Sequence, residues 1–118
     1  MSKIVQAVNA MISHKNLISH VAWGEREIFF LYKGRHKWSM RKDADDYYLW
    51  YYPGTEEIEQ LTHFGDDEWE GTPMVSYRAS ELGTKEADAS FAELYSVLKE
   101  RIYGMNDVLD DIISEDDY

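Results

Sequence analysis

The chain has no cysteine and only two prolines among its 118 residues. The absence of cysteine excludes disulfide bonds, thiolate metal ligands and cysteine nucleophiles. No apolar run approaches the ~18 consecutive residues that a transmembrane helix needs. The first residues, Met1-Ser2-Lys3, are followed by polar Gln6 and Asn9 among the apolar positions, which is unlike a secretory signal. We therefore expect a cytoplasmic protein.

Motifs that identify a reaction are missing as well. The four histidines share no metal-ligand spacing, and His63 beside the acidic residues 66–68 is explained more simply as a helix end followed by a solvated loop. Asp43, Asp45 and Asp46 lack the glycine and the distant glutamate of a calcium-binding loop. The chain has neither a glycine-rich phosphate loop nor a G-x-S-x-G motif. We expect no catalytic residue, no metal site and no cofactor, and hence not an enzyme.

Acidic residues are in excess, and they are unevenly distributed. The formal net charge is −11. Residues 1–53 hold eight Lys/Arg and five Asp/Glu, a balance of +3, whereas residues 54–118 hold four and eighteen, a balance of −14. Such a chain repels nucleic acid and anionic membranes. We expect a protein partner with a basic surface; the alternative is that the charge serves solubility alone.

An apolar content of 44% and an aromatic content of 14% predict a folded chain, and its length predicts one domain over residues 1–118. The chain is organised around the six residues 47–52, Tyr-Tyr-Leu-Trp-Tyr-Tyr, which read as a strand ending at Pro53-Gly54. Its period of two places apolar or aromatic side chains on both faces of a sheet. Both faces therefore need cover.

The remaining elements follow from hydrophobic periodicity and turn residues. We expect helices over about 3–14, from Thr55 to Phe64, over 85–103 and around Val108–Ile113, strands over about 17–23, 27–33, 36–41, 47–52 and 73–79, and a loop over 65–72. The fold class is thus α+β: an antiparallel β-meander of four to five strands packed with an N-terminal helix, a short middle helix, and one long plus one short C-terminal helix. The last helix should fray unless it packs, because acidic residues near its C-terminus oppose the helix dipole.

For the core, we expect Phe30, Trp38 and Trp50 to be buried together with Leu94 and Leu98. The opposite face would then carry a set of interface residues, namely Tyr47, Leu49, Tyr51, Phe29 and Leu31. That set needs either helices on both faces of the sheet or a homodimer that buries it, and the shortness of two of the helices favours the homodimer.

Two further surfaces are candidates for binding. One is an acidic loop with an aromatic anchor at its centre, comprising Asp66, Asp67, Glu68, Trp69 and Glu70. The other is a basic hairpin comprising Lys33, Arg35, Lys37, Arg41 and Lys42. The alternatives are that Trp69 folds back over the core edge and that the basic residues guard a sheet edge against aggregation.

In size, charge and element order, the chain is similar to two kinds of small acidic protein. One is the dimeric chaperones of type III secretion systems, and the other is the acidic inhibitors that phages and bacteria direct against host-defence or toxin proteins. The preferred hypothesis is a non-enzymatic binding module, an acidic inhibitor or immunity-type protein that engages a basic partner. The alternatives are a small acidic dimeric chaperone or adaptor, and a small-ligand domain or enzyme with a pocket between sheet and helices.

Overall fold

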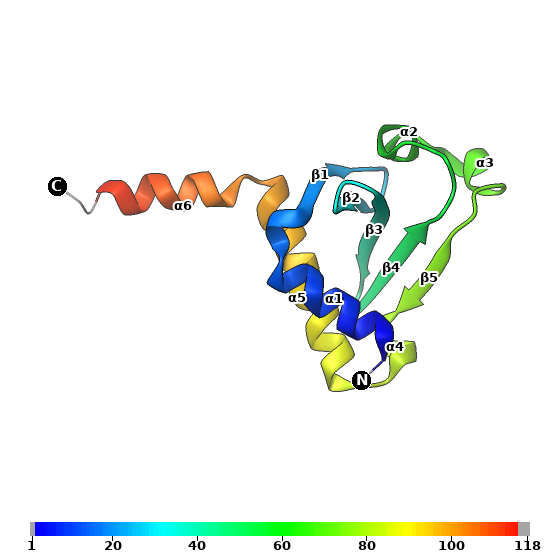
Figure 1. The fold of residues 1–118 in the computed structure, drawn as a ribbon, viewed down its shortest axis with the longest axis horizontal. Coiled ribbons are helices and arrows are strands. Elements are labelled where there is room, and N and C mark those ends of the chain that lie inside the picture. Colours follow the sequence, from blue (N-terminus) through cyan, green and yellow to red (C-terminus); the bar gives the residue numbers. More distant parts are fainter. Residues whose placement is uncertain (1, 116–118) are drawn as a thin grey trace.

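The computed structural model describes residues 2–115 and shows the expected α+β architecture (Figure 1). The elements are α1 (Lys3–Ser13), η1 (Lys15–Leu17), β1 (Ile18–Trp23), β2 (Ile28–Tyr32), β3 (His36–Asp43), β4 (Asp46–Tyr52), α2 (Ile58–Thr62), α3 (Asp66–Trp69), β5 (Val75–Arg78), α4 (Ala79–Leu82), α5 (Lys85–Ile102) and α6 (Met105–Ser114). The predicted order of helix, four strands, helix, strand and two C-terminal helices is confirmed. The structure adds the short helices α3 and α4.

The five strands form one antiparallel sheet in the order β1-β2-β3-β4-β5, so each strand pairs with its neighbour in the sequence. The β2–β3 hairpin turns at Lys33 and Gly34, both with positive φ (58° and 68°). Two left-handed residues in succession give a tight turn whose twist matches that of the strands. Opposite Phe30 lies Trp38, and opposite Met40 lies Leu49. This register decides which side chains share a face.

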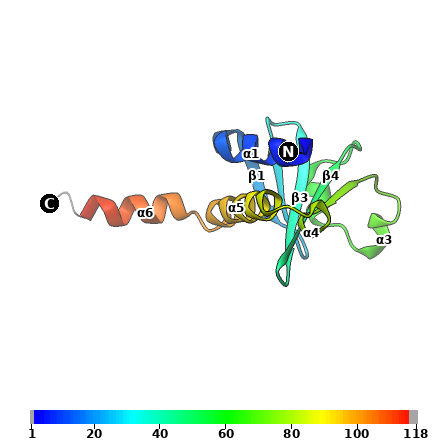
Figure 2. The same cartoon turned by 90° about the horizontal axis from the view of Figure 1, so that it is seen from below.

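One face of the sheet is covered by α1 and α5 (Figure 2). Phe30, Met40 and Leu49 point to this face and are fully buried. They pack in one cluster with Leu94 and Leu98 of α5. The Thr84 hydroxyl caps α5 by accepting a hydrogen bond from the Ala87 amide (3.1 Å), as the sequence predicts for this helix start.

The other face is covered by the two short helices α2 and α3. Phe29 and Tyr52 of the sheet are buried there with Ile58 and Leu61 of α2. Trp69 of α3 lies against them, with its ring stacked on that of Phe29 at a centroid distance of 6.1 Å. Helices thus lie on both faces of the sheet, and the N-terminal helix shares its face with α5.

The expected core assignment is partly wrong. Phe30 is buried with Leu94 and Leu98 as expected, but Trp38 packs against their cluster only half-buried. Trp50 lies on the α2–α3 side and is also only half-buried. The expected set of interface residues is divided in the same way, because Phe29 and Leu31 lie on the face opposite to Tyr47, Leu49 and Tyr51. Phe29 and Leu49 are fully buried. The five residues therefore do not form one open patch.

Two local predictions are also corrected. The helix expected from Thr55 begins only at Ile58, where the Glu57 amide donates to the Gln60 side chain (2.7 Å). The segment expected to be a loop contains α3, which begins after Gly65, whose amide donates to the Glu68 carboxylate (3.0 Å). Acidic residues in a first helical turn interact favourably with the helix dipole, and this explains helix formation in so polar a segment.

Helix α6 projects away from the body of the molecule, beyond the end of α5 (Figures 1 and 2). Gly104 makes the break between the two helices in a left-handed conformation (φ 63°). None of the residues of α6 is buried. The projection gives the molecule extents of 56 × 33 × 27 Å. Within residues 2–115, no helix combines the length and the apolar character needed to cross a membrane.

Candidate functional site

The acidic loop predicted as a binding surface is the α3 region, and its central tryptophan points inward. The ring of Trp69 contacts those of Phe29, Tyr52 and Phe64, with centroid distances of 5.1–6.1 Å. Of the two interpretations of Trp69, the structure shows the one in which it folds back over the core edge. The carboxylates that remain outside are exposed, namely Asp66, Asp67, Glu68 and Glu70. The predicted loop therefore offers charge, but Trp69 is not its exposed aromatic anchor.

The five residues of the basic hairpin do not form one patch. The ammonium group of Lys37 donates to the carbonyl oxygens of Gly54 and Glu56 and thereby holds the chain after β4 against the sheet. Arg41 stacks over the ring of Trp50 on the same face, 5.7 Å from its centroid. Lys33 and Arg35 lie at the β2–β3 turn, and Lys42 lies over the ring of Tyr47. Lys33 also lies over an aromatic ring, that of Tyr32 (6.0 Å to its centroid), and Lys33, Arg35 and Lys42 are exposed.

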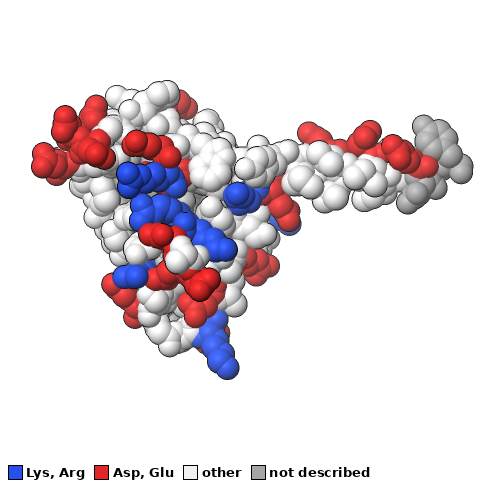
Figure 3. All heavy atoms as spheres, turned by 180° about the vertical axis from the view of Figure 1, so that it is seen from behind, with Lys and Arg blue, Asp and Glu red and all other residues white. Residues whose placement is uncertain are grey.

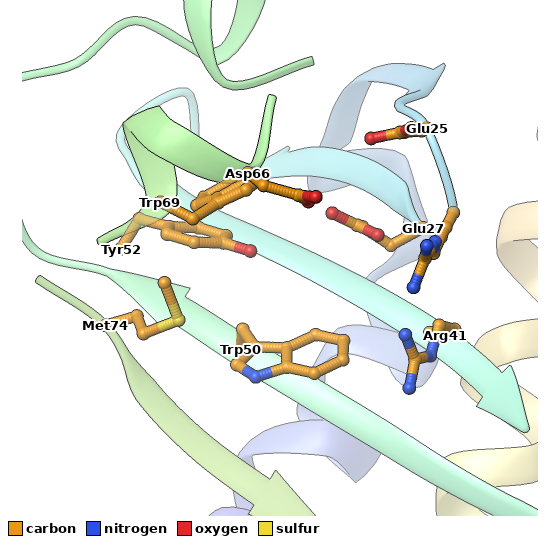
Figure 4. Close-up of a pocket in the computed structure, with 9 residues that line it drawn as sticks. Glu25, Glu27, Arg41, Trp50, Tyr52, Asp66, Trp69 and Met74 are labelled. Atoms are coloured by element: carbon orange, nitrogen blue, oxygen red, sulfur yellow. The ribbon is translucent and has the colours of Figure 1, made fainter. Parts of the chain in front are cut away.

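A pocket of about 230 Å³ lies between the sheet and α3 (Figure 4). Trp50 lies along one side of it, and the carboxylates of Glu27 and Asp66 point toward one another across it. Burial raises the pKa of Glu27, against the opposing effects of Arg41 and Arg26. The turn between β1 and β2, which carries Glu27, packs closely against the Phe29 ring at Gly24. A Cβ on Gly24 would come within 2.3 Å of that ring.

The charged groups around this pocket nearly cancel. Three carboxylates, those of Glu25, Glu27 and Asp66, face two guanidinium groups, those of Arg26 and Arg41. Arg41 already covers the indole ring that an organic cation would use. No group of three or more His, Asp or Glu side chains able to hold a metal ion occurs within the described range. The pocket shows no arrangement that specifies a reaction or a ligand.

Helix α6 carries an exposed apolar stripe, defined here as Val108, Leu109, Ile112 and Ile113. Their exposed fractions run from 44% for Val108 to 61% for Ile113. The spacing i, i+1, i+4, i+5 places these side chains on one side of the helix. Aspartates occupy the remaining circumference at positions 107, 110 and 111. A contiguous apolar surface bordered by charge is the usual form of a helix that docks into a groove.

Most acidic residues of the second half of the chain lie toward two ends of the molecule. In Figure 3, Asp and Glu gather at the end that carries α2 and α3, and a second row follows one edge of the projecting α6. Between them, Lys and Arg form a band on the body with acidic groups on either side. Further acidic residues of 54–118 are exposed on α4 and α5, at positions 81, 86, 88, 93 and 100, so the balance of −14 does not form one continuous surface. Helix α6 joins its charge to four exposed aliphatic side chains.

An open groove of about 440 Å³ lies between α1 and strands β2 to β5 of the sheet. We call it the aromatic groove; its lining residues are Ala7, Ala10, Met11, Tyr32, Lys33, His36, Trp38, Tyr51, Val75 and Tyr77. None of these residues is acidic. Burial lowers the pKa of His36, with further contributions from Arg35 and Lys33, so the rim of the groove has a positive local potential.

Comparisons with protein-family models, curated proteins and solved structures found no match. The function must therefore be argued from the surfaces themselves.

Sequence reasoning found the residues of the apolar stripe but not their exposure. The pattern Val108, Leu109, Ile112, Ile113 is that of any amphipathic helix, and it does not show whether the apolar side packs within the chain. The aromatic groove was missed because its lining comes from five elements far apart in the sequence. The one available signal was the excess of tyrosine and tryptophan over what a single core needs.

Proposed function

We propose that this protein is a non-enzymatic binding module that engages a protein partner through α6 and its acidic border. The observation that carries the proposal is the apolar stripe, whose four aliphatic side chains are all exposed on a helix that projects from the body. Burial of such side chains contributes about 1.5–3 kcal/mol each, which is a strong driving force for association. The expected partner presents an apolar groove with a basic border.

The charge of α6 favours a protein over a membrane as its target. An amphipathic helix that binds lipid carries Lys and Arg on its polar side, where they meet anionic headgroups. Helix α6 carries Asp107, Asp110 and Asp111 there instead. These carboxylates would be repelled by an anionic membrane and attracted by a basic protein surface. The inhibitor or immunity-type role expected from the sequence fits this surface, and the cytoplasmic location stays a prediction.

The proposal is tested by capturing partners from an extract of the source cell with the wild-type chain and with Ile112→Asp. The substitution places a charge in the centre of the apolar stripe, where no side chain is buried. The matched control is Ser96→Asp, the same new charge at an exposed position of α5. A specific partner should be retained by the wild type and the control and lost with Ile112→Asp. Equal capture by all three proteins would refute the proposal.

Salt dependence then tests the acidic border against the purified partner. Binding should weaken as ionic strength rises, mainly through slower association. Reversing Asp67 and Glu70 to Lys at the α3 end tests whether the second acidic surface takes part; Glu68 is kept because it accepts the Gly65 hydrogen bond. An association rate that is the same at low and high salt would show that the acidic residues serve solubility alone.

The second candidate is a dimeric chaperone or adaptor, and the aromatic groove favours it. Tyr51, Val75 and Tyr77 line an apolar opening on the sheet. In an adaptor, such an opening would receive a segment of another chain. A synthetic apolar helix bearing acidic residues should then quench or shift the tryptophan fluorescence on titration, because Trp38 lines the groove, and Trp38→Phe should remove the change. An unchanged wild-type spectrum would speak against the adaptor.

A further inference from the structure

We infer that the aromatic groove of one copy of this chain receives helix α6 of a second copy, so that two copies exchange their C-terminal helices. The inference rests on the proposed role of α6 as a docking helix and names its partner. It joins two apolar surfaces of the described residues, the apolar stripe and the aromatic groove.

Charge complementarity supports this pairing. The aromatic groove contains no acidic residue, and Lys33 and His36 lie at its rim beside Arg35. Helix α6 contains no basic residue, and its polar side carries three aspartates. Docking would place those aspartates next to the cations of the β2–β3 turn. The opposite balances of residues 1–53 and 54–118, +3 and −14, favour this contact between unlike halves of two copies.

The same charges disfavour the simplest alternative, in which two α6 helices pair with each other. That arrangement would place three aspartates of each copy on two adjacent helices that carry no cation, so like charges repel. A helix seated in the groove of the other copy keeps the two acidic helices apart.

The position of α6 indicates that the helix in the aromatic groove comes from a second copy and not from the same chain. Helix α6 points away from the body, and the body carries the groove beside α1 (Figures 1 and 2). The ten residues of α6 span about 15 Å, enough to lie across a groove on a neighbouring molecule. In a two-fold pair the contact forms twice, once with each helix, which doubles the area that one short helix could bury.

Sedimentation equilibrium tests the inference with one variant on each side of the contact. Ile112→Asp damages the apolar stripe and leaves the groove intact. Ala10→Glu adds bulk and negative charge at an exposed position of the groove wall and leaves α6 intact. Wild type should form dimers, and each variant alone should associate at least about tenfold more weakly. The matched control Ala89→Glu, at an exposed position of α5 outside the groove, should associate like the wild type.

Mixing the two variants gives the sharpest result. An Ala10→Glu copy still offers a helix, and an Ile112→Asp copy still offers a groove, so one of the two contacts survives in the mixed pair. Titrating labelled Ala10→Glu with Ile112→Asp should therefore give tighter binding than either variant shows for itself. A mixed pair no tighter than either variant alone would overturn the exchange.

A charge swap adds an independent readout. Lys33→Glu at the groove rim should weaken the dimer, and adding Asp110→Lys with Asp111→Lys to the same chain should restore part of the lost affinity. Unaltered thermal melts of all variants at low protein concentration would show that the fold is retained. Failure of the lysine variants to restore any affinity would refute the placement of α6 at this rim.

The outcomes separate this inference from the proposed function. A wild-type chain that stays a 13.9 kDa monomer overturns the exchange, whereas partner capture through α6 is decided by the Ile112→Asp experiment described above. If Ile112→Asp abolishes dimers and Ala10→Glu does not, α6 docks elsewhere and the groove assignment is wrong. If dimers form as inferred but no partner is captured, the basic partner is refuted and self-association stands.

Discussion

Phe29 and Phe30 are adjacent in the chain and both fully buried, yet they lie in separate hydrophobic clusters on opposite faces of the sheet. Phe30 packs with α1 and α5, and Phe29 packs with α2 and α3. Because successive side chains of a strand point to opposite faces, one dipeptide contributes to both cores. The small helices α2 and α3 are therefore part of the fold and not additions to it.

Replacing Phe30 by Ala should destabilise the protein by about 3–5 kcal/mol, the range for a fully buried aromatic side chain. Trp50→Ala should cost less, because its indole ring is only half-buried. Urea denaturation of both variants measures the difference. A larger loss for Trp50→Ala than for Phe30→Ala would contradict the assignment of the faces.

The buried hydroxyl groups of Ser39 and Tyr52 are 2.6 Å apart and bond to each other. Burial raises the pKa of the Tyr52 phenol, although the bond to Ser39 opposes this shift. Ser39→Ala or Tyr52→Phe alone should cost about 1–3 kcal/mol, because each leaves a buried hydroxyl without a partner. The double variant should lose less than the two losses added together. Additive losses in a double-mutant cycle would show that this bond contributes nothing of its own.

Asp46 ties the start of β4 to the start of α4. Its carboxylate accepts hydrogen bonds from the Ser80 hydroxyl (2.7 Å) and from Arg78 (2.6 Å), which, with backbone amides, lower its pKa from 3.8 to about 2. A carboxylate whose pKa is lower in the folded than in the unfolded state stabilises the protein at pH values above its unfolded pKa. This stabilisation is lost as the pH falls through the pKa of the folded state.

The melting temperature of Asp46→Asn should therefore lie below that of wild type at neutral pH. The gap should close as pH falls from about 3.8 toward 2, the two pKa values of the group. Thermal melts over this range measure it, with Asp45→Asn, at the exposed neighbouring position, as the control. A gap that is constant with pH would show that the ionised carboxylate is not the stabilising form.

Ile112→Asp should leave the melting temperature unchanged at protein concentrations low enough to keep copies apart, because α6 buries no residue. Leu98→Ala, in the core, should cost about 2–5 kcal/mol. Comparing both by thermal melts shows whether α6 contributes to the stability of a single copy. A clear drop for Ile112→Asp under these conditions would mean that the apolar stripe packs against its own chain.

Local signals were sufficient for most of the fold. Strands separated by turns of a few residues predict a meander, since short connections can join only antiparallel neighbours. Thr84 and Gly104 mark the ends of α5 through interactions within a few residues of each end, so the sequence contains them directly. The failures at α2 and α3 are local as well: Thr55 is a residue type that caps helices although α2 begins after Glu57, and an acidic segment resembles a loop.

The α+β class, the strand order, the two-sided apolar character of β4 and the unequal charge of the two halves all follow from the amino-acid sequence. Packing in three dimensions is needed to know which face each aromatic residue joins, that Trp69 turns inward, and that the apolar stripe of α6 stays outside. The physical reason is that periodicity gives each element its apolar side, whereas the neighbour that covers this side is set by packing between residues far apart in the chain. For Phe29 that neighbour is α3, and for Ile112 the described chain supplies none.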